Sequence, residues 1–273
     1  MPVSLMPTLL LSVMAIAAIM TTDLSSHRIE SASPVASVTL STPAEDFSRP
    51  FDAVIHLTLS PDWYLYWTNP GDAGMSLAAE WHLPEGFQAG DLRFPTPEKI
   101  VHEGIVAFGY YDDLIILCTL TPPAGYRGGN RDTIRVDLDW LVCSQSCIPG
   151  KASLAMALDV VPARRIAAKE LADRFSRQAP GDLADAGIKA GTAHATRTDS
   201  GLIIQVPLTK SVDDFYPETI HDSVIDHKRI TVGENGITIP ATPYEASTIV
   251  KSISGLAIVK GKGYRLQTRV EYQ

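Results

Sequence analysis

The sequence predicts an all-β protein of two immunoglobulin-like β-sandwich domains joined by a short helical connector. Three observations support this. Short apolar runs with a period of two recur along most of the chain, separated by glycine, proline, aspartate and asparagine. No helical pattern interrupts these runs in the first half of the chain, which is typical of a sandwich of antiparallel strands. One segment, residues 162–181, instead has the period of an amphipathic helix.

The first domain is expected to span residues 31–161. Its clearest strand patterns are at residues 34–40, 51–59, 63–67, 113–120, 133–142 and 152–160, with turn signals such as Asn69-Pro70-Gly71-Asp72 between them. The aromatic residues of 63–67 and Trp81 are expected in the core. Cys118 shares a strand face with Leu114, Ile116 and Leu120, so we expect a buried thiol there.

Residues 162–181 are expected to form the helical linker. Pro162 suits the first turn of a helix and Pro180-Gly181 would end it. The apolar stripe is predicted at Ile166, Ala167, Leu171 and Phe175. This segment is interpreted as an interdomain connector.

The second, smaller β-domain is expected at residues 188–273. It contains no cysteine, and its strand patterns are at residues 201–208, 229–232, 236–241, 255–260 and 263–272. Its one chemically suggestive group is His221, Asp222, Asp226 and His227, which in principle offers metal ligands. Polar residues of a surface loop explain this group more simply, so we expect neither a metal nor another cofactor.

The N-terminus and the net charge indicate the compartment and exclude one class of partner. Residues 1–22 are interpreted as an export signal peptide or an uncleaved N-terminal anchor, because an apolar run shorter than a membrane span lies there. The bulk of the chain would then be extracytoplasmic, where disulfides persist. With a net charge of −8 and no cluster of lysine and arginine, nucleic acid is not an expected partner.

The most informative motif is the pair Cys143 and Cys147. Alternating residues before and after the pair predict two strands, and residues 144–146 are polar and short enough to be a hairpin turn. Residues four apart in one extended strand lie roughly 13 Å apart, too far for a disulfide. Across a tight hairpin they face each other, so the spacing suits a disulfide at the end of a hairpin.

Three roles for this pair remain open on the residues alone. Closing so short a loop stabilises a fold by only about 2 kcal/mol, so a purely structural disulfide would contribute little here. The alternatives are a thiol–disulfide exchange pair and a dithiol that binds a soft metal such as Cu(I). Zinc is less favoured, because no second pair of ligands follows at the usual spacing. Asp139 disfavours a thiolate and Lys151 is the only nearby cation, so the sequence does not indicate a strongly activated thiol.

Four segments, taken in order, resemble a known family. They are DWYLYWTNPGDAG (62–74), WHLPEGF (81–87), FGYYDDLIIL (108–117) and DLDWLVCSQSCIPG (137–150). The resemblance is to the N-terminal periplasmic domain of the thiol:disulfide interchange protein DsbD, in its ScsB-like form. Residues 162–273 are similar to the second β-domain of those relatives. The chain as given lacks the transmembrane and thioredoxin domains of full-length members.

The resemblance implies a function and a site. Cys143 and Cys147 match the exchanging pair, which would pass reducing equivalents between a membrane-embedded DsbD-like electron donor and periplasmic thioredoxin-like partners. The family also has a loop that caps these cysteines, and it corresponds loosely to residues 102–111. On that basis Phe108, Tyr110 and Tyr111 are expected to shield the pair. The alternative function is a non-catalytic periplasmic binding module whose dithiol is structural or binds Cu(I).

Overall fold

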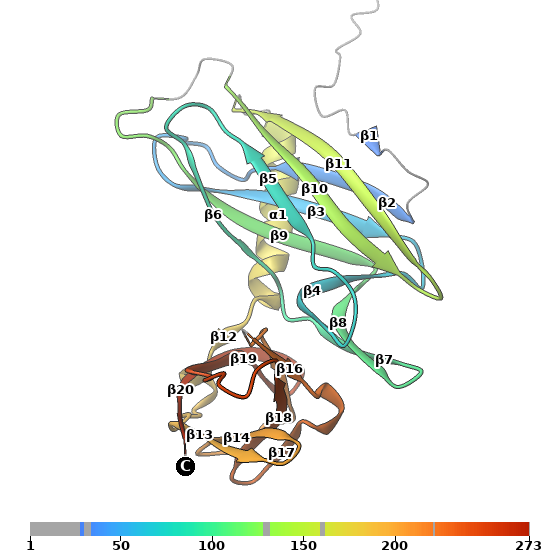
Figure 1. Cartoon of the computed structure of the whole chain (residues 1–273). Coiled ribbons are helices and arrows are strands. Elements are labelled where there is room, and N and C mark those ends of the chain that lie inside the picture. The colour runs from blue at the N-terminus through green and yellow to red at the C-terminus, as the bar shows by residue number, and fades with distance from the viewer. Residues whose placement is uncertain (1–27, 30–33, 128–131, 159–161, 221, 273) are drawn as a thin grey trace, which may run out of the picture.

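The structure is a computed structural model that describes residues 28–29, 34–127, 132–158, 162–220 and 222–272. The expected export segment, residues 1–22, lies outside the described residues. Figure 1 shows two bodies built of strands, with one α-helix running along the first toward the second. Within the described ranges, no helix has the length and apolar character needed to cross a membrane. The predicted all-β class with a connecting helix is confirmed.

The first domain is a sandwich of two antiparallel sheets. The smaller sheet has the order β2 (Val35–Ser41), β3 (Phe51–Leu59), β9 (Asp113–Thr121), β6 (Gln88–Arg93). The larger sheet has the order β1 (Arg28–Ile29), β11 (Cys147–Ala157), β10 (Thr133–Cys143), β4 (Tyr64–Gly71), β8 (Ile105–Tyr111), β7 (Glu98–His102), and β5 (Ala78–His82) also pairs with β10.

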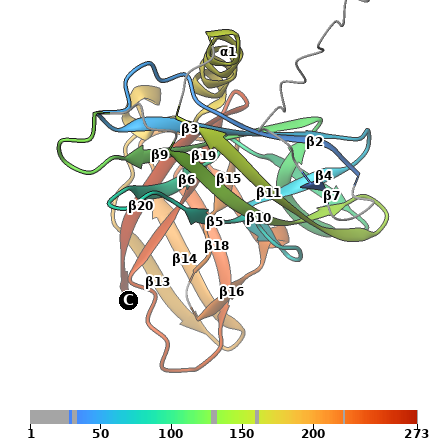
Figure 2. The ribbon, with the colours of Figure 1, turned by 90° about the horizontal axis from the view of Figure 1, so that it is seen from above.

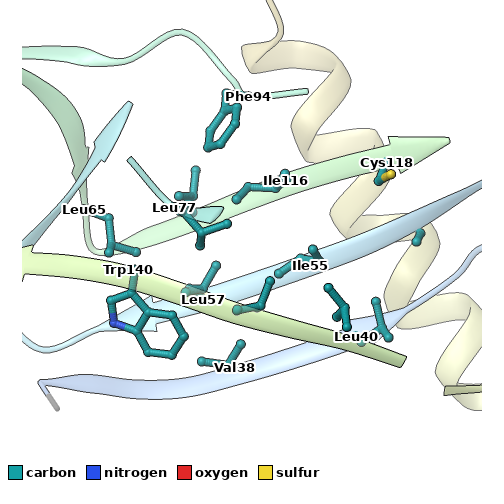
Figure 3. Close-up of a cluster of buried hydrophobic side chains, with 14 of the residues drawn as sticks. Val38, Leu40, Ile55, Leu57, Leu65, Leu77, Phe94, Ile116, Cys118 and Trp140 are labelled. Atoms are coloured by element: carbon teal, nitrogen blue, oxygen red, sulfur yellow. The ribbon is translucent and has the colours of Figure 1, made fainter. Parts of the chain in front are cut away.

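The core of this domain follows the period of two along each strand. On β10, Val136, Leu138 and Trp140 point between the sheets and are fully buried, as their alternation predicts. Figure 3 shows Trp140 and Leu65 from the larger sheet meeting residues of the smaller sheet in one apolar layer. The inward face of β9 contributes Ile116 and Cys118 to the same layer, so the expected burial of Cys118 is confirmed.

Helix α1 (Pro162–Gln178) packs on the outer face of the smaller sheet rather than bridging free space. Phe175 is buried against Val54 and the outward residues Ile115 and Leu117. Figure 2, seen from above, places α1 outside β3. The predicted stripe is only partly right. Phe175 and Leu171 face the sheet, but Ala167 is exposed and its neighbour Ala168 is buried instead. Ile166 is 58% exposed, because nine residues at 100° each place it opposite Phe175.

The second domain has its own apolar core and one continuous set of hydrogen-bonded strands. The order is β15 (Asp214–Pro217), β19 (Ser252–Val259), β20 (Lys262–Tyr272), β13 (Ala193–Thr198), β14 (Gly201–Pro207), β18 (Gly236–Pro243), β16 (Ser223–Ile225). Short strands β12 (Gly181–Asp182) and β17 (Thr231–Gly233) pair with β20 and β18, and two 3-10 turns are η1 (Leu183–Ala186) and η2 (His227–Arg229). Parallel pairing of β13 with β20 joins what would otherwise be two separate sheets.

Candidate functional site: the Cys143–Cys147 hairpin

Cys143 and Cys147 form a disulfide across the last pair of the β10–β11 hairpin. Their Cα atoms are 4.1 Å apart, and the strands are in register from Thr133 opposite Ala157 to Cys143 opposite Cys147. The turn is closed by a hydrogen bond of 3.1 Å from the Ser144 N–H to the Ser146 carbonyl. The expectation that a hairpin turn brings the two cysteines within disulfide range is confirmed.

The disulfide lies on the outer face of the larger sheet, not in the sandwich core. Val142 points inward, so Cys143, the next residue, points outward. The two sulfur-bearing residues differ in exposure: Cys143 is 1% exposed, whereas Cys147 is exposed. The disulfide therefore joins one exposed residue to one covered residue.

Aromatic side chains of the same sheet cover Cys143. They belong to a group that we call the outer aromatic cluster, which comprises Tyr64, Tyr66, Ile100, Ala107, Tyr111, Leu141 and Cys143. The Tyr66 hydroxyl donates a hydrogen bond of 3.0 Å to the Cys143 sulfur and lies 3.8 Å from the Cys147 sulfur. Tyr64 packs edge-to-face against both Tyr66 and Tyr111, with ring centroids 5.3 and 5.6 Å away.

The environment keeps the Tyr66 hydroxyl protonated. Burial, together with a hydrogen bond shared with Tyr64, raises the pKa of Tyr66 far above its usual value of 10.0. A protonated phenol is a donor, so Tyr66 presents a hydrogen to the Cys143 sulfur at any physiological pH. Burial, with smaller contributions from Tyr64, Glu98 and Asp62, also raises the pKa of Tyr111.

Lys151 is not the cation beside the cysteines that the sequence suggested. It pairs with Asp139 at 2.7 Å, and Asp139 stands opposite Lys151 four positions along the ladder from the disulfide. Four residues of a strand span roughly 13 Å. The polar group that contacts both sulfurs is instead the Tyr66 hydroxyl.

Residues 105–111, most of the segment 102–111 that was expected to be a capping loop, form a strand. Alternation along β8 separates the three candidates. Phe108 and Tyr110 point into the core: Phe108 packs against Trp67, and Tyr110 stacks on Phe94 and donates a hydrogen bond of 2.9 Å to the Pro95 carbonyl. Of the three, Tyr111 alone lies in the outer aromatic cluster, where it contacts Tyr64 rather than the sulfurs.

Sequence reasoning missed Tyr64 and Tyr66 by assigning all of residues 63–67 to the core. In the structure Leu65 and Trp67 point inward, while Tyr64 and Tyr66 point outward onto the disulfide. A signal was present, because phenols at alternate positions carry hydroxyls that a sandwich core would have to satisfy. Without the register of β4 against β10, in which Tyr64 stands opposite Cys143, the pattern could not be assigned to this site.

The remaining candidates lie elsewhere. His221 is outside the described residues, Asp222 is exposed, and His227 is buried against the first domain instead of lying in a surface loop. In the part of the chain that the structure describes, no three His, Cys, Asp or Glu side chains gather as a metal site would require. Burial raises the pKa of the Cys118 thiol to about 11.

The comparisons with known proteins agree with this geometry. Residues 37–159 match the family "Thiol:disulfide interchange protein DsbD, N-terminal". The chain is similar to the crystal structure of the N-terminal periplasmic domain of ScsB from Proteus mirabilis, with a TM-score of 0.64 and 15% identity over 85% of this chain and 91% of that one. The reduced N-terminal domain of Neisseria meningitidis DsbD also matches, with a TM-score of 0.31 and 12% identity over 44% of this chain and 83% of that one.

No curated protein matches the sequence. The likeness to the ScsB domain shows a shared fold across both domains of the chain, and the family match covers the whole of the hairpin that carries Cys143 and Cys147. Residues 37–159 thus match the DsbD N-terminal family within a chain of the ScsB-like fold, and the cysteine pair of this domain is joined in a disulfide at the end of the β10–β11 hairpin.

Proposed function

We propose that this chain is an extracytoplasmic thiol–disulfide exchange protein. Through Cys143 and Cys147 it passes reducing equivalents between a membrane-embedded DsbD-like electron donor and periplasmic thioredoxin-like partners. The observation that carries the proposal is a hairpin disulfide between the exposed residue Cys147 and Cys143, which is buried under a tyrosine hydroxyl, in a segment that matches the DsbD N-terminal family. The periplasmic origin of the similar ScsB domain supports the assigned compartment.

The exposure of the two cysteines supports one order of events. A thiolate of a reduced partner attacks the exposed Cys147 sulfur, the Cys143–Cys147 bond breaks, and Cys143 leaves as a thiolate. The second thiol of the partner then loses its proton and attacks the partner's first cysteine sulfur, which is bonded to Cys147 in the mixed disulfide. This attack releases Cys147. The partner ends as a disulfide, and Cys143 and Cys147 end as two thiols after taking up two protons.

Tyr66 is suited to assist the first step. A leaving thiolate carries more negative charge than a disulfide sulfur, so a hydrogen bond from a protonated phenol stabilises it more strongly. The Tyr66 hydroxyl is already 3.0 Å from the Cys143 sulfur in the oxidised form. The group that would stabilise the leaving sulfur therefore needs no rearrangement to reach it.

A purely structural disulfide is the rival that the geometry disfavours. The two strands are already paired along eleven opposed positions, from Thr133–Ala157 to Cys143–Cys147, and other strands of the sheet flank them. A covalent link at the end of this ladder adds only about 2 kcal/mol of loop-closure stabilisation. An exchanging pair needs an accessible sulfur, and Cys147 provides one.

Trapping of mixed disulfides tests the proposal. We expect Cys143→Ala, which leaves the exposed Cys147 alone, to accumulate a partner as a mixed disulfide, because no second thiol of this chain remains to release it. Cys147→Ala leaves the buried Cys143 and should trap far less. The measurement is non-reducing electrophoresis of periplasmic extracts, with mass spectrometry to ask whether the trapped protein has a thioredoxin-like cysteine pair.

The double variant Cys143→Ala/Cys147→Ala is the matched control, since it retains Cys118 as its only thiol and should trap nothing. If both single variants are folded and exported, yet neither yields a reducible adduct, the exchange function is wrong. A disulfide with a reduction potential well below about −300 mV would indicate the structural role instead.

A further inference from the structure

The two domains meet through a buried polar group as well as through apolar side chains. Tyr216 from β15 packs against Phe108 of the first domain, with ring centroids 4.8 Å apart. Beside this contact lie Asn69 and His227, each only 5% exposed, on opposite sides of the boundary. Buried polar side chains require partners, so their hydrogen bonds define how the domains fit together.

The hydrogen bonds determine which nitrogen of the His227 ring donates and which accepts. Asn69 accepts a hydrogen bond of 3.0 Å from the Gly71 N–H and donates one of 2.7 Å to the Pro217 carbonyl, which fixes the orientation of its amide. The amide nitrogen also lies 3.4 Å from His227 Nε2, which must therefore accept. The other ring nitrogen, Nδ1, donates to Asp72 Oδ1 at 2.9 Å. We call Asn69, Asp72, Pro217 and His227 the interdomain node.

The node holds the end of the strand that also carries Tyr66. Between Tyr66 and Gly71 the pairing of β4 with β8 loses register: Tyr66 stands opposite Gly109 but Gly71 opposite Ala107. Residues 67–70 thus stand against the single residue Phe108 and bulge from the ladder, and among them Asn69 reaches the second domain. Asp72 lies just beyond these residues, and its Oδ2 atom accepts a hydrogen bond of 2.9 Å from the Val106 N–H.

Beyond Asp72 the chain folds back over Tyr66. Gly74 lies so close to the Tyr66 ring that there is no room for a Cβ atom, and its φ of +118° is one that side-chain-bearing residues rarely adopt. Ser76 then forms a β-bridge with Tyr66 itself. A continuous series of contacts therefore runs from His227 through Asp72 and Gly74 to Tyr66, and from Tyr66 to the Cys143 sulfur.

We infer that the second domain sets the reactivity of the disulfide, with His227 as a positioning residue. By fixing Asp72, His227 holds residues 72–76 against the Tyr66 ring, and this support aims the Tyr66 hydroxyl at Cys143. The biological role of this positioning rests on the proposed exchange function. Its effect on the Tyr66 hydroxyl, however, can be tested without any partner protein.

The experiment is a double-mutant comparison of the equilibrium between the protein disulfide and glutathione. We expect His227→Ala to lower the equilibrium constant for reduction by about twofold to fivefold, less than Tyr66→Phe does, because the Cys143 thiolate loses part of a charge-assisted hydrogen bond. In a Tyr66→Phe background the same substitution should change nothing further. Gly74→Ala, which displaces Tyr66 from the other end of the path, should shift the constant in the same direction and should also have no effect in Tyr66→Phe.

Two variants separate positioning from simple loss of structure. Lys99→Met removes the ion pair of 3.0 Å between Lys99 and Asp214, which crosses the same domain boundary without touching residues 72–76, and it should leave the equilibrium constant unchanged. His227→Gln keeps both a donor and an acceptor, and we expect it to restore at least part of the wild-type value.

Two results would overturn the inference: a His227→Ala shift that persists undiminished in Tyr66→Phe, or a loss of stability without any shift. If His227→Ala does not fold, a Gly74→Ala protein whose glutathione equilibrium constant equals that of the wild type would overturn the inference instead. Failure of the exchange function itself would appear separately, as the absence of trapped partners with Cys143→Ala. The glutathione equilibrium would still report on Tyr66 in that case.

Discussion

The sandwich core and the outer aromatic cluster each bury a cysteine, yet the two surroundings favour different ionisation states of the sulfur. Cys118 lies in the core, where its thiol donates a hydrogen bond of 3.2 Å to the Gly90 carbonyl. Cys143 lies in the outer cluster, where its sulfur accepts a hydrogen bond from Tyr66 and is bonded to the exposed Cys147. Burial favours the neutral thiol of Cys118, whereas the hydrogen bond that the Cys143 sulfur accepts favours a thiolate there. Burial alone therefore does not decide whether a cysteine is inert.

The two faces of β8 give the largest test of this comparison. Phe108→Ala removes a fully buried ring from the core, and we expect a loss of about 3–5 kcal/mol in the free energy of unfolding. Tyr111→Ala acts on the partly exposed side of the outer cluster, and we expect about 1 kcal/mol or less. Urea unfolding of both oxidised variants measures the difference.

Alkylation of the reduced proteins adds the functional side of that test. Tyr111→Ala should speed labelling of Cys143, because Tyr111 supports Tyr64 and through it the ring of Tyr66. Phe108→Ala also removes contacts with Tyr216 and His227, so under conditions in which the variant is folded it should change this rate, but less than Tyr111→Ala does. If Phe108→Ala alone speeds the labelling of Cys143, then the assignment of Phe108 to the core and of Tyr111 to the cover over Cys143 is wrong.

A second prediction concerns Cys118 and pH. Burial raises its pKa from 9.0 to about 11, so the folded state keeps the proton over a range in which the unfolded state releases it. The associated stability is fully present below about pH 9 and is lost as the pH rises to about 11, by at most about 3 kcal/mol.

Cys118→Ala is the variant that isolates this effect. Burial also raises the pKa of both Tyr126 and Tyr216 to about 12, and these groups contribute to pH dependence in wild type and variant alike. The difference between the two unfolding profiles should therefore grow between about pH 9 and pH 11. Parallel profiles would mean that Cys118 ionises as easily in the folded protein as in the unfolded chain.

The smallest expected effect comes from removing one hydroxyl. Tyr66→Phe deletes the donor to Cys143, and we expect the glutathione equilibrium constant for reduction to fall by about threefold to tenfold. Tyr110→Phe is the matched control, because it deletes a hydroxyl bonded to the Pro95 carbonyl on the core side of the neighbouring strand. If both substitutions shift the constant equally, the hydrogen bond to Cys143 has no special role.

Much of the first domain could be predicted because its signals are local. The alternation of Val136, Leu138 and Trp140 predicted a half-buried strand, and the spacing of Cys143 and Cys147 predicted the disulfide-bearing turn. Each inference needed only the period of a strand and the reach of a disulfide.

The features that were missed depend on register and on distant contacts. Tyr66 covers the disulfide because β4 pairs with β10 at Tyr64–Cys143, a match between segments 79 residues apart. His227 is buried and donates a hydrogen bond to Asp72, which lies 155 positions earlier in the chain. The helix stripe was wrong at Ile166 because apolar character alone did not identify the face that Phe175 and Leu171 present to the sheet.

The eleven-position ladder of the β10–β11 hairpin has a further consequence once the disulfide is reduced. The ladder keeps the two thiols opposite each other, so each experiences the other at a high effective concentration. A mixed disulfide formed at Cys147 therefore has a competing nucleophile, Cys143, already in place to expel an unproductive partner. In the proposed exchange, complexes with wrong partners would then be short-lived, and only a partner whose own second thiol reacts faster would complete the reaction.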